Sequence, residues 1–360
     1  MSTQSSLFDS LVSIQSSCVL ATLVQVKGSS YRRPGARMLL EPEGVRQGVL
    51  SGGCLETDLA ARVVQILAQG VAQVVKYDMG SELDRIWGTG MGCQGKADIL
   101  LTPLAPGPGP AWASQVREAL KARRPAVLLT CFGAEDTHFA PGQTWCWQPT
   151  DPEGTLPASM VEACRRVLET ERPTTVTLEG SRILVEPVLP PVALWIYGAG
   201  ENARPLAELA IHLGWDVGIL DHRPALAQAG RFPGARTVLA GPPAALGAAL
   251  GADGRSAGVV MTHIFEPDKA MLRAMLESSL PYVGLQGNRQ RSEQVLTELE
   301  QEGFHLDQDR LRRLHAPMGL DLGAESPEII ALAVLAEIQA VLSGRPPIPL
   351  RERRGSIHGS

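Results

Sequence analysis

A glycine-rich turn between a strand and a helix limits most strongly what this chain can fold into. Residues 193–197 are apolar and predict a buried strand, and residues 202–213 repeat apolar side chains at helical spacing (Leu206, Leu209, Ala210 and Leu213). The turn at residues 198–203 has the pattern Gly-x-Gly-x-x-Ala, which lets a helix start close to a strand and to a bound phosphate. This context predicts a Rossmann-like domain.

The residues after this turn continue to alternate between strand-like and helix-like segments. Strands are expected at 215–220, 258–261 and 281–285, and Asp221 closes the first of them at the spacing of an acid that binds a ribose diol. A final helix is expected to begin after an N-cap at Ser326, where proline follows. The alternation predicts an α/β fold with a doubly wound parallel sheet.

Two segments rich in helix breakers divide the chain. Residues 103–110 contain mainly Pro, Gly and Ala and are expected to form a linker without regular structure, and residues 189–191 are a second breaker that contains a proline pair. We therefore expect an N-terminal mixed α/β domain over 1–103, a middle α/β segment over 111–188 that packs with it, a C-terminal Rossmann-like domain over 192–344 and a flexible tail over 345–360.

A cysteine stands where a helix is expected to begin in the N-terminal part. Ser51, Gly52, Gly53 and Cys54 follow a strand-like run, and the next residues place apolar side chains on one helix face (Leu55, Leu59, Val63, Ile66 and Leu67). The free amides of a helix start attract anions and favour a thiolate, and glycines let a bulky ligand approach the backbone. The loop predicts an activated or ligating cysteine, although a tight strand-to-helix turn would fit the same pattern.

A second cysteine lies among glycines. Residues 87–95 place Cys93 in a loop with four glycines before a strand-like run. Two loops that each present a thiol suit a soft, thiophilic ligand, so Cys54 and Cys93 are candidate contacts to a metal or to sulfur. The alternative for Cys93 is a wide turn.

Polar residues follow two strands of the predicted parallel sheet. Ligands of such sheets bind at the carboxyl ends of the strands, so these side chains are candidates for binding. Asn288 fits a helix cap equally well. The candidate contacts of this domain are Gly198, Gly200, Asp221, Thr262, His263, Asn288 and Arg289.

Charge and cysteine usage exclude several classes of function. A formal net charge of −5 leaves no surplus of Lys and Arg for phosphates, so nucleic acid is not expected as a ligand. We expect no secretory signal and no membrane span, because no apolar run approaches the roughly 20 residues that a span needs. Six cysteines without a CxxC pair are typical of a reducing cytoplasm, and Cys18 and Cys131 are expected to be buried thiols.

Several segments along the chain, taken together, resemble the XdhC/CoxI family, the maturation factors of xanthine and carbon monoxide dehydrogenases. The resemblance covers nearly the whole chain, and so many matches in the same order argue against chance. It rests on residues 28–38, 51–56, 198–200, 261–263, 282–289, 317–324 and 326–328.

The resemblance implies a cytoplasmic chaperone without turnover of its own that self-associates as a homodimer. Such proteins bind the molybdenum cofactor, a molybdopterin, protect it while a cysteine desulfurase supplies a terminal sulfido ligand, and deliver it to the large subunit of a molybdenum hydroxylase. On this sequence it makes Cys54 the leading cofactor contact, together with Ser51, Gly52, Gly53 and Glu56, and makes Cys93 the second.

Three other functions fit parts of the sequence. The Rossmann-like turn and Asp221 would serve a nicotinamide-dependent oxidoreductase. Cys54 or Cys93 would serve a sulfurtransferase that carries a persulfide. A nucleotidyl-transfer role, as in distant relatives that act on cytosine dinucleotide forms of the cofactor, ranks last.

The chain also departs from the family pattern at three places. Glu201 stands where the family usually has His after the Gly-x-Gly, and Gln94 stands where a second glycine pair often follows the later cysteine. Residues 264–268 replace the acid or second His that is common directly after the His at position 263. These differences bear on metal or proton-transfer chemistry at the Rossmann-like turn and leave the two thiols unaffected.

Overall fold

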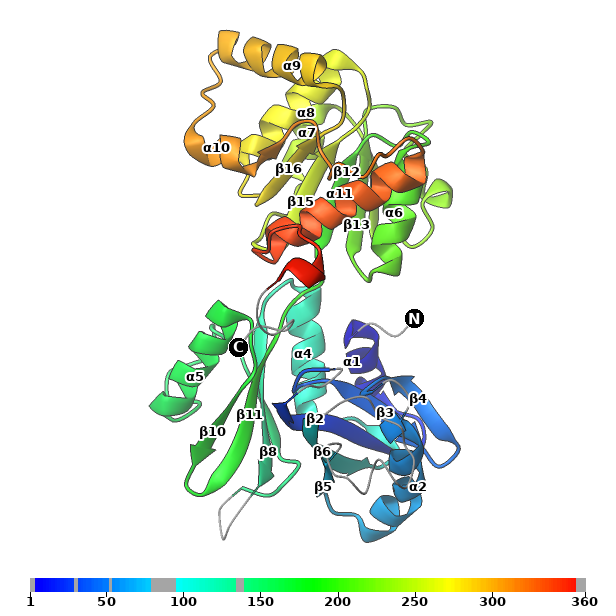
Figure 1. Cartoon of the computed structure of the whole chain (residues 1–360), viewed down its shortest axis with the longest axis vertical. Coiled ribbons are helices and arrows are strands. Elements are labelled where there is room, and N and C mark those ends of the chain that lie inside the picture. The colour runs from blue at the N-terminus through cyan, green and yellow to red at the C-terminus, as the bar shows by residue number, and fades with distance from the viewer. Residues whose placement is uncertain (1–3, 29–31, 52–53, 79–94, 134–138, 354–360) are drawn as a thin grey trace. The chain divides into compact units, whose positions relative to one another are not determined.

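The computed structural model describes residues 4–28, 32–51, 54–78, 95–133 and 139–353 and divides the chain into two compact units, Met1–Pro190 and Pro191–Ser360. Each unit has its own sheets and helices (Figure 1). Gly52, Gly53 and Cys93, which were predicted as ligand contacts, lie outside the described residues.

A five-stranded antiparallel sheet of order β4-β3-β2-β6-β5 opens the first unit. Helix α2 (Cys54–Gln69) packs on this sheet through Leu55, Leu59, Val63 and Ile66, so the predicted helix face is confirmed. The strands are β2 (Cys18–Gly28), β3 (Arg37–Glu41), β4 (Gly44–Gly48), β5 (Gln73–Asp78) and β6 (Gly95–Leu104).

A four-stranded antiparallel sheet of order β10-β11-β8-β9 completes the first unit. Its strands are β8 (Ala126–Gly133), β9 (Thr144–Trp147), β10 (Thr174–Leu178) and β11 (Ser181–Val188), and α5 (Ala158–Thr170) packs on it. Helices α1 (Gln4–Val12) and α4 (Ala111–Lys121) share one buried cluster with Leu39 of the first sheet and Leu128 of the second. The middle segment and the N-terminal segment therefore have a common core.

The prediction of an unstructured linker at residues 103–110 was wrong. Strand β6 continues to Leu104, and β7 (Gly107–Pro108) pairs antiparallel with β1 (Ser13–Ile14). Gly109 donates a hydrogen bond to the carbonyl of Val12 (3.0 Å), and a Cβ at Gly109 would lie 1.7 Å from the Leu11 carbonyl oxygen. The small residues of this segment thus permit close packing against the chain that follows α1.

The second unit contains a six-stranded parallel sheet of order β14-β13-β12-β15-β16-β17. Numbered along the chain this order is 3-2-1-4-5-6, the order of dinucleotide-binding Rossmann folds, and the predicted doubly wound sheet is confirmed. The strands are β12 (Ala193–Tyr197), β13 (Asp216–Asp221), β14 (Thr237–Ala240), β15 (Ser256–Val260), β16 (Tyr282–Leu285) and β17 (Leu314–His315).

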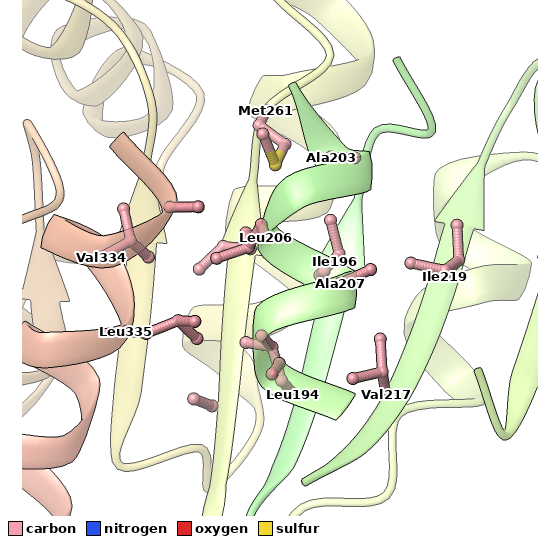
Figure 2. Packing of buried hydrophobic residues seen from close by; sticks show 14 of the residues in the cluster. Leu194, Ile196, Ala203, Leu206, Ala207, Val217, Ile219, Met261, Val334 and Leu335 are labelled. Carbon is pink, nitrogen blue, oxygen red and sulfur yellow. The ribbon is translucent and has the colours of Figure 1, made fainter. Parts of the chain in front are cut away.

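Helices cover both faces of the parallel sheet. On one face α6 (Ala203–His212) and α11 (Pro327–Leu342) pack against alternate strand residues such as Leu194, Ile196 and Val217 (Figure 2). The other face is covered by α7 (Pro243–Ala248), α8 (Phe265–Glu277) and α9 (Arg289–Gln301), and α10 (Gln308–Arg313) precedes β17. Burial on both faces explains why these strands are almost continuously apolar.

The buried face of α6 differs from the one predicted. Leu206 and Ala210 are buried as expected, but Leu209 and Leu213 are 37% and 59% exposed. The buried face of α6 contains small residues, among them Ala203 and Ala207, and these let the helix approach the sheet closely.

Helix α11 begins as predicted, because the Ser326 hydroxyl accepts a hydrogen bond from the Ile329 amide. Val334 and Ile338 are buried in the core, whereas Ile329 and Val341 are 40% and 36% exposed. None of the described helices is both long and apolar enough to cross a membrane.

Candidate functional site

The loop before α2 is held in place by a carboxylate from the helix itself. Glu56 accepts hydrogen bonds from the amides of Ser51 (2.8 Å) and Leu50 (3.3 Å), and the Ser51 hydroxyl donates to its other oxygen. That hydroxyl in turn accepts from the Leu55 amide (3.2 Å). Since α2 begins at Cys54, these bonds fix where the cysteine backbone enters the helix.

Glu56 is only 8% exposed, yet it remains an acceptor for three donors. Burial works to raise the pKa of the Glu56 carboxyl, but the hydrogen bonds from Ser51 and Leu50 outweigh it and hold the pKa below its ordinary value. Glu56 was predicted as a ligand contact through the family motif; its described contacts are with the loop, and its contact with a ligand remains a prediction.

A Glu56→Gln variant is expected to lower the free energy of unfolding by about 1–2 kcal/mol, because an amide replaces a charged acceptor. Since the pKa is lowered in the folded state, the carboxylate stabilises the fold above its unfolded pKa of about 4.3, and this contribution disappears as pH falls through the folded value. Urea unfolding of both proteins between neutral and acidic pH measures the difference. The exposed Glu43→Gln is the control, and equal losses for the two variants would contradict the assignment.

In the second unit, the glycine turn lies at the switch point of the sheet, between the carboxyl ends of β12 and β15. Gly198 has φ +124°, and a Cβ there would lie 2.8 Å from the backbone of Met261 and Thr262. Only glycine therefore lets the turn rest against the end of β15. Gly200 borders open space, since a Cβ there would meet no atom within 4 Å.

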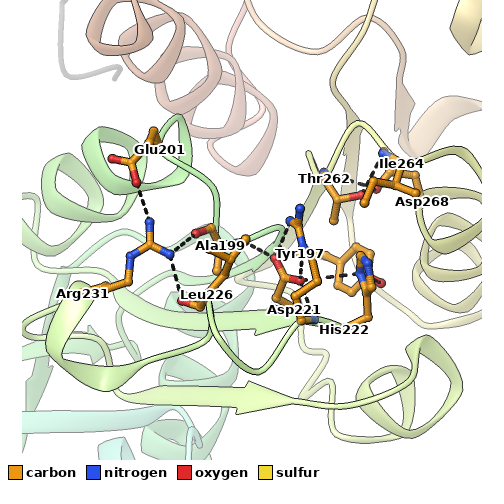
Figure 3. A network of polar contacts seen from close by, with 11 residues as sticks. Tyr197, Ala199, Glu201, Asp221, His222, Leu226, Arg231, Thr262, Ile264 and Asp268 are labelled. Carbon is orange, nitrogen blue, oxygen red and sulfur yellow. Dashed lines mark hydrogen bonds and ion pairs between the residues drawn. The ribbon is translucent and has the colours of Figure 1, made fainter.

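Arg231 supports this turn from the segment after β13. Its guanidinium donates to the carbonyl oxygens of Ala199 (3.0 Å) and Leu226 (3.2 Å) and to the Glu201 carboxylate (2.6 Å) (Figure 3). Arg204 also pairs with Glu201 (3.3 Å). Glu201, which stands in place of the family's usual His, is thus the acid that two arginines share.

Asp221 lies at the carboxyl end of β13 and is fully buried. One oxygen accepts from the Ala199 amide (2.6 Å) and from Arg223 Nη2 (2.9 Å); the other accepts from the amide (2.8 Å) and Nε (2.9 Å) of Arg223. Burial works to raise the pKa of the Asp221 carboxyl, but these hydrogen bonds outweigh it and lower the pKa. Next to it, His222 Nδ1 lies 3.2 Å from the Tyr197 hydroxyl.

The end of β15 is organised by Asp268 of α8. This fully buried carboxylate accepts from the hydroxyl (2.5 Å) and amide (3.2 Å) of Thr262 and from Arg291 Nη2 (2.8 Å). The Thr262 hydroxyl also accepts from the Ile264 amide (3.1 Å), and Figure 3 shows Thr262, Ile264 and Asp268 around one turn. His263 lies inside that turn with φ +62°, a conformation unusual for a residue with a side chain, and its side chain is exposed.

The strand end after β16 carries a helix cap. The Asn288 side chain accepts from the Arg291 amide (2.8 Å), so the cap, one of its two predicted roles, is present. Arg289 is exposed in the first turn of α9. Ligand contacts of Asn288, Arg289, Thr262 and His263 remain predictions.

Four cysteines lie outside the two glycine loops, and none of their thiols is activated. Cys18 and Cys131 are buried as predicted, and burial raises the pKa of both. Burial also raises the pKa of Cys146 and of Cys164 to about 12. Across the described part of the chain, no three His, Cys, Asp or Glu side chains gather as a metal site would require.

Several residues that shape the two loops were not predicted from sequence. These residues are Arg223, Arg231, Asp268 and Arg291, and the last three were missed because their roles depend on contacts between segments that are distant in sequence. Arg223 left a usable signal, since it stands only two residues after the acid that it neutralises.

Comparison with known proteins agrees with this architecture. A parallel sheet of this order with a glycine turn at its switch point defines a Rossmann-type domain, which this chain joins to an antiparallel unit. Residues 12–78 match the family model described as XdhC and CoxI family, and residues 194–338 match the model described as XdhC Rossmann domain.

Relatives match over nearly the full length. The chain is 30% identical to a probable xanthine dehydrogenase subunit from Bacillus subtilis over 92% of this chain and 95% of that protein. It is 26% identical to the molybdenum cofactor insertion chaperone PaoD of Escherichia coli over 90% and 83% of the two chains. A crystal structure described as a xanthine dehydrogenase from Bacillus halodurans covers 96% of this chain with a TM-score of 0.75 and 26% identity. The chain belongs to the XdhC and CoxI family.

Proposed function

We propose that this protein binds the molybdenum cofactor as cargo, holds it while a terminal sulfido ligand is installed, and delivers it to the large subunit of a xanthine dehydrogenase-type hydroxylase. Similarity to a molybdenum cofactor insertion chaperone over most of both chains supports this role. A cysteine desulfurase would supply the sulfur, and the chaperone would work as a cytoplasmic homodimer.

The observation that carries the proposal is the position of Cys54 at the first residue of a 16-residue helix. A helix start of this length favours a thiolate, which is the form that ligates molybdenum or accepts sulfur. The Glu56 and Ser51 hydrogen bonds fix the backbone on the strand side of the glycine pair. Cys93 is the second proposed thiol contact.

Reconstitution tests this role. Wild-type protein and a Cys54→Ala variant are incubated with molybdenum cofactor under anaerobic, reducing conditions and desalted, and the retained pterin is measured by fluorescence. The variant is expected to lose at least about nine-tenths of the pterin, since a lost charged contact commonly costs tenfold or more in affinity. Equal retention by the two proteins would show that Cys54 is not the anchor.

Cys146→Ala is the matched control for this experiment. Cys146 lies in the same unit as Cys54, is partly buried, and has a pKa raised to about 12, so it remains a neutral thiol. Its removal is expected to leave pterin retention unchanged. A loss equal to that of Cys54→Ala would mean that thiol deletion acts through folding.

A sulfurtransferase is the second candidate, because the same thiolate could carry a persulfide. Incubation with a cysteine desulfurase and L-cysteine, followed by mass spectrometry, distinguishes the two roles. A cargo chaperone is expected to keep its unmodified mass, and the added mass of one sulfur atom on Cys54 or Cys93 would favour the sulfurtransferase.

A further inference from the structure

Asp221, which ends β13 beside the glycine turn, has no lone pair left to accept a hydrogen bond from a ligand. A carboxylate offers about four lone-pair positions, and Asp221 already receives four hydrogen bonds, one from Ala199 and three from Arg223. It is also fully buried. In dinucleotide-binding folds the acid at this place accepts from the ribose hydroxyls, so such a diol has no partner here.

Arg223 is the residue that fills these positions. It contributes two of the four hydrogen bonds through its side chain, while the other two come from backbone amides that any residue except proline at 199 and 223 would supply. Its side chain is 34% exposed, and within the described residues its Nη1 donates no hydrogen bond. The edge of the guanidinium that faces away from Asp221 is thus free to meet an anion.

The neighbouring turn also has donors to offer. Among the described residues, the amides of Gly200, Glu201 and Asn202 donate no hydrogen bond, and Gly200 borders open space. The Asp221–Arg223 pair is neutral as a unit, so it does not repel an anion in the way that a free carboxylate would.

We propose that Arg223 sets the ligand specificity of the Rossmann unit: by saturating Asp221 it excludes nicotinamide dinucleotides, and it leaves the glycine turn to a ligand that brings a phosphate without a ribose diol. A phosphorylated pterin has this chemistry, and that identification rests on the proposed function. The exclusion of the dinucleotide depends only on the contacts of Asp221.

Calorimetric titration with NAD⁺ and NADP⁺ tests the exclusion in the full chain. Wild-type protein is expected to show no saturable binding of either. Arg223→Ala keeps both backbone bonds to Asp221 and exposes two acceptor positions, so its affinity for NAD⁺ is expected to rise roughly tenfold or more. NADP⁺ is expected to gain less, because the freed carboxylate repels its 2′-phosphate.

Two further variants keep the test decisive. Combining Asp221→Asn with Arg223→Ala removes the freed charge and is expected to abolish the gain in NAD⁺ affinity. If Arg223→Ala does not fold, Arg223→Gln replaces it, because the glutamine amide reaches only one carboxylate oxygen. Tight binding of NAD⁺ by wild type, or no gain in a folded Arg223 variant, would overturn the proposal. No molybdenum cofactor is used, so failure here would leave the Cys54 experiment to decide the chaperone role separately.

Discussion

A Glu186→Ala variant is expected to lose about 3–5 kcal/mol of unfolding free energy, because it leaves Arg37 as an unpaired buried cation. The side chains of this pair, from β3 and β11, are each 4% exposed. Arg37 Nη1 lies 3.1 Å from Glu186 Oε2, and Nη2 contacts the other oxygen. The Arg37 guanidinium also donates to the Gly35 carbonyl (3.0 Å) and lies 6.0 Å and 5.9 Å from the ring centres of Phe8 and Trp112. With both side chains this deeply buried, bulk water has little access to the guanidinium, so its charge would lose most of its compensation.

Thermal unfolding followed by circular dichroism measures this loss, which corresponds to a fall in midpoint of roughly 10 °C for a unit of this size. Hydrogen exchange of peptides from β3 and β11 locates it. The exposed Glu43→Ala is expected to change stability by less than about 0.5 kcal/mol. An Arg37→Met, Glu186→Leu double variant should recover most of the loss, because apolar residues often replace a buried pair without penalty. A loss below about 1 kcal/mol for Glu186→Ala would contradict the prediction.

The Arg37–Glu186 ion pair is a feature of the first unit that could not be predicted from the sequence. The family motif around residues 28–38 marked Gly35 and Arg37 but gave no reason for either. Gly35 has φ +96°, and a Cβ there would lie 2.0 Å from Glu186 Oε2, so glycine is required by both the backbone and its neighbour. Glu186 lies 149 residues after Arg37 on a different sheet. No local pattern can indicate such a partner, because the contact depends on how the sheets pack.

The second unit was more predictable because its signals are local. The glycine turn, the apolar strands and the caps at Asn288 and Ser326 all act within a few residues, and all are present in the structure. Asp221 shows the limit of such signals. Its spacing predicted a ribose contact, but whether the carboxylate is available depends on the side chain of Arg223, and spacing says nothing of hydrogen-bond saturation.

An Asp268→Ala variant is expected to lose about 3 kcal/mol of unfolding free energy in the second unit, because it removes a buried carboxylate from an ion pair and from a turn at once. Arg291, only 19% exposed, would lose its partner, and the amide and hydroxyl of Thr262 would lose their acceptor. Since the Thr262 hydroxyl holds the Ile264 amide, the turn that keeps His263 at φ +62° would loosen too.

Two measurements test this expectation. Hydrogen exchange across residues 258–268 should show faster exchange of the Thr262 and Ile264 amides than in wild type, and urea unfolding measures the loss of stability. Asp309→Ala is the matched control: Asp309 pairs with Arg312 and Arg313 but is 60% exposed, so its loss should cost less than about 1 kcal/mol. Adding Arg291→Met to Asp268→Ala should restore part of the stability, because it removes the unpaired cation, but should not restore protection at Thr262, whose acceptor is still missing. If the double variant restored both, Asp268 would serve only to neutralise Arg291, and the geometry of the His263 turn would need another cause.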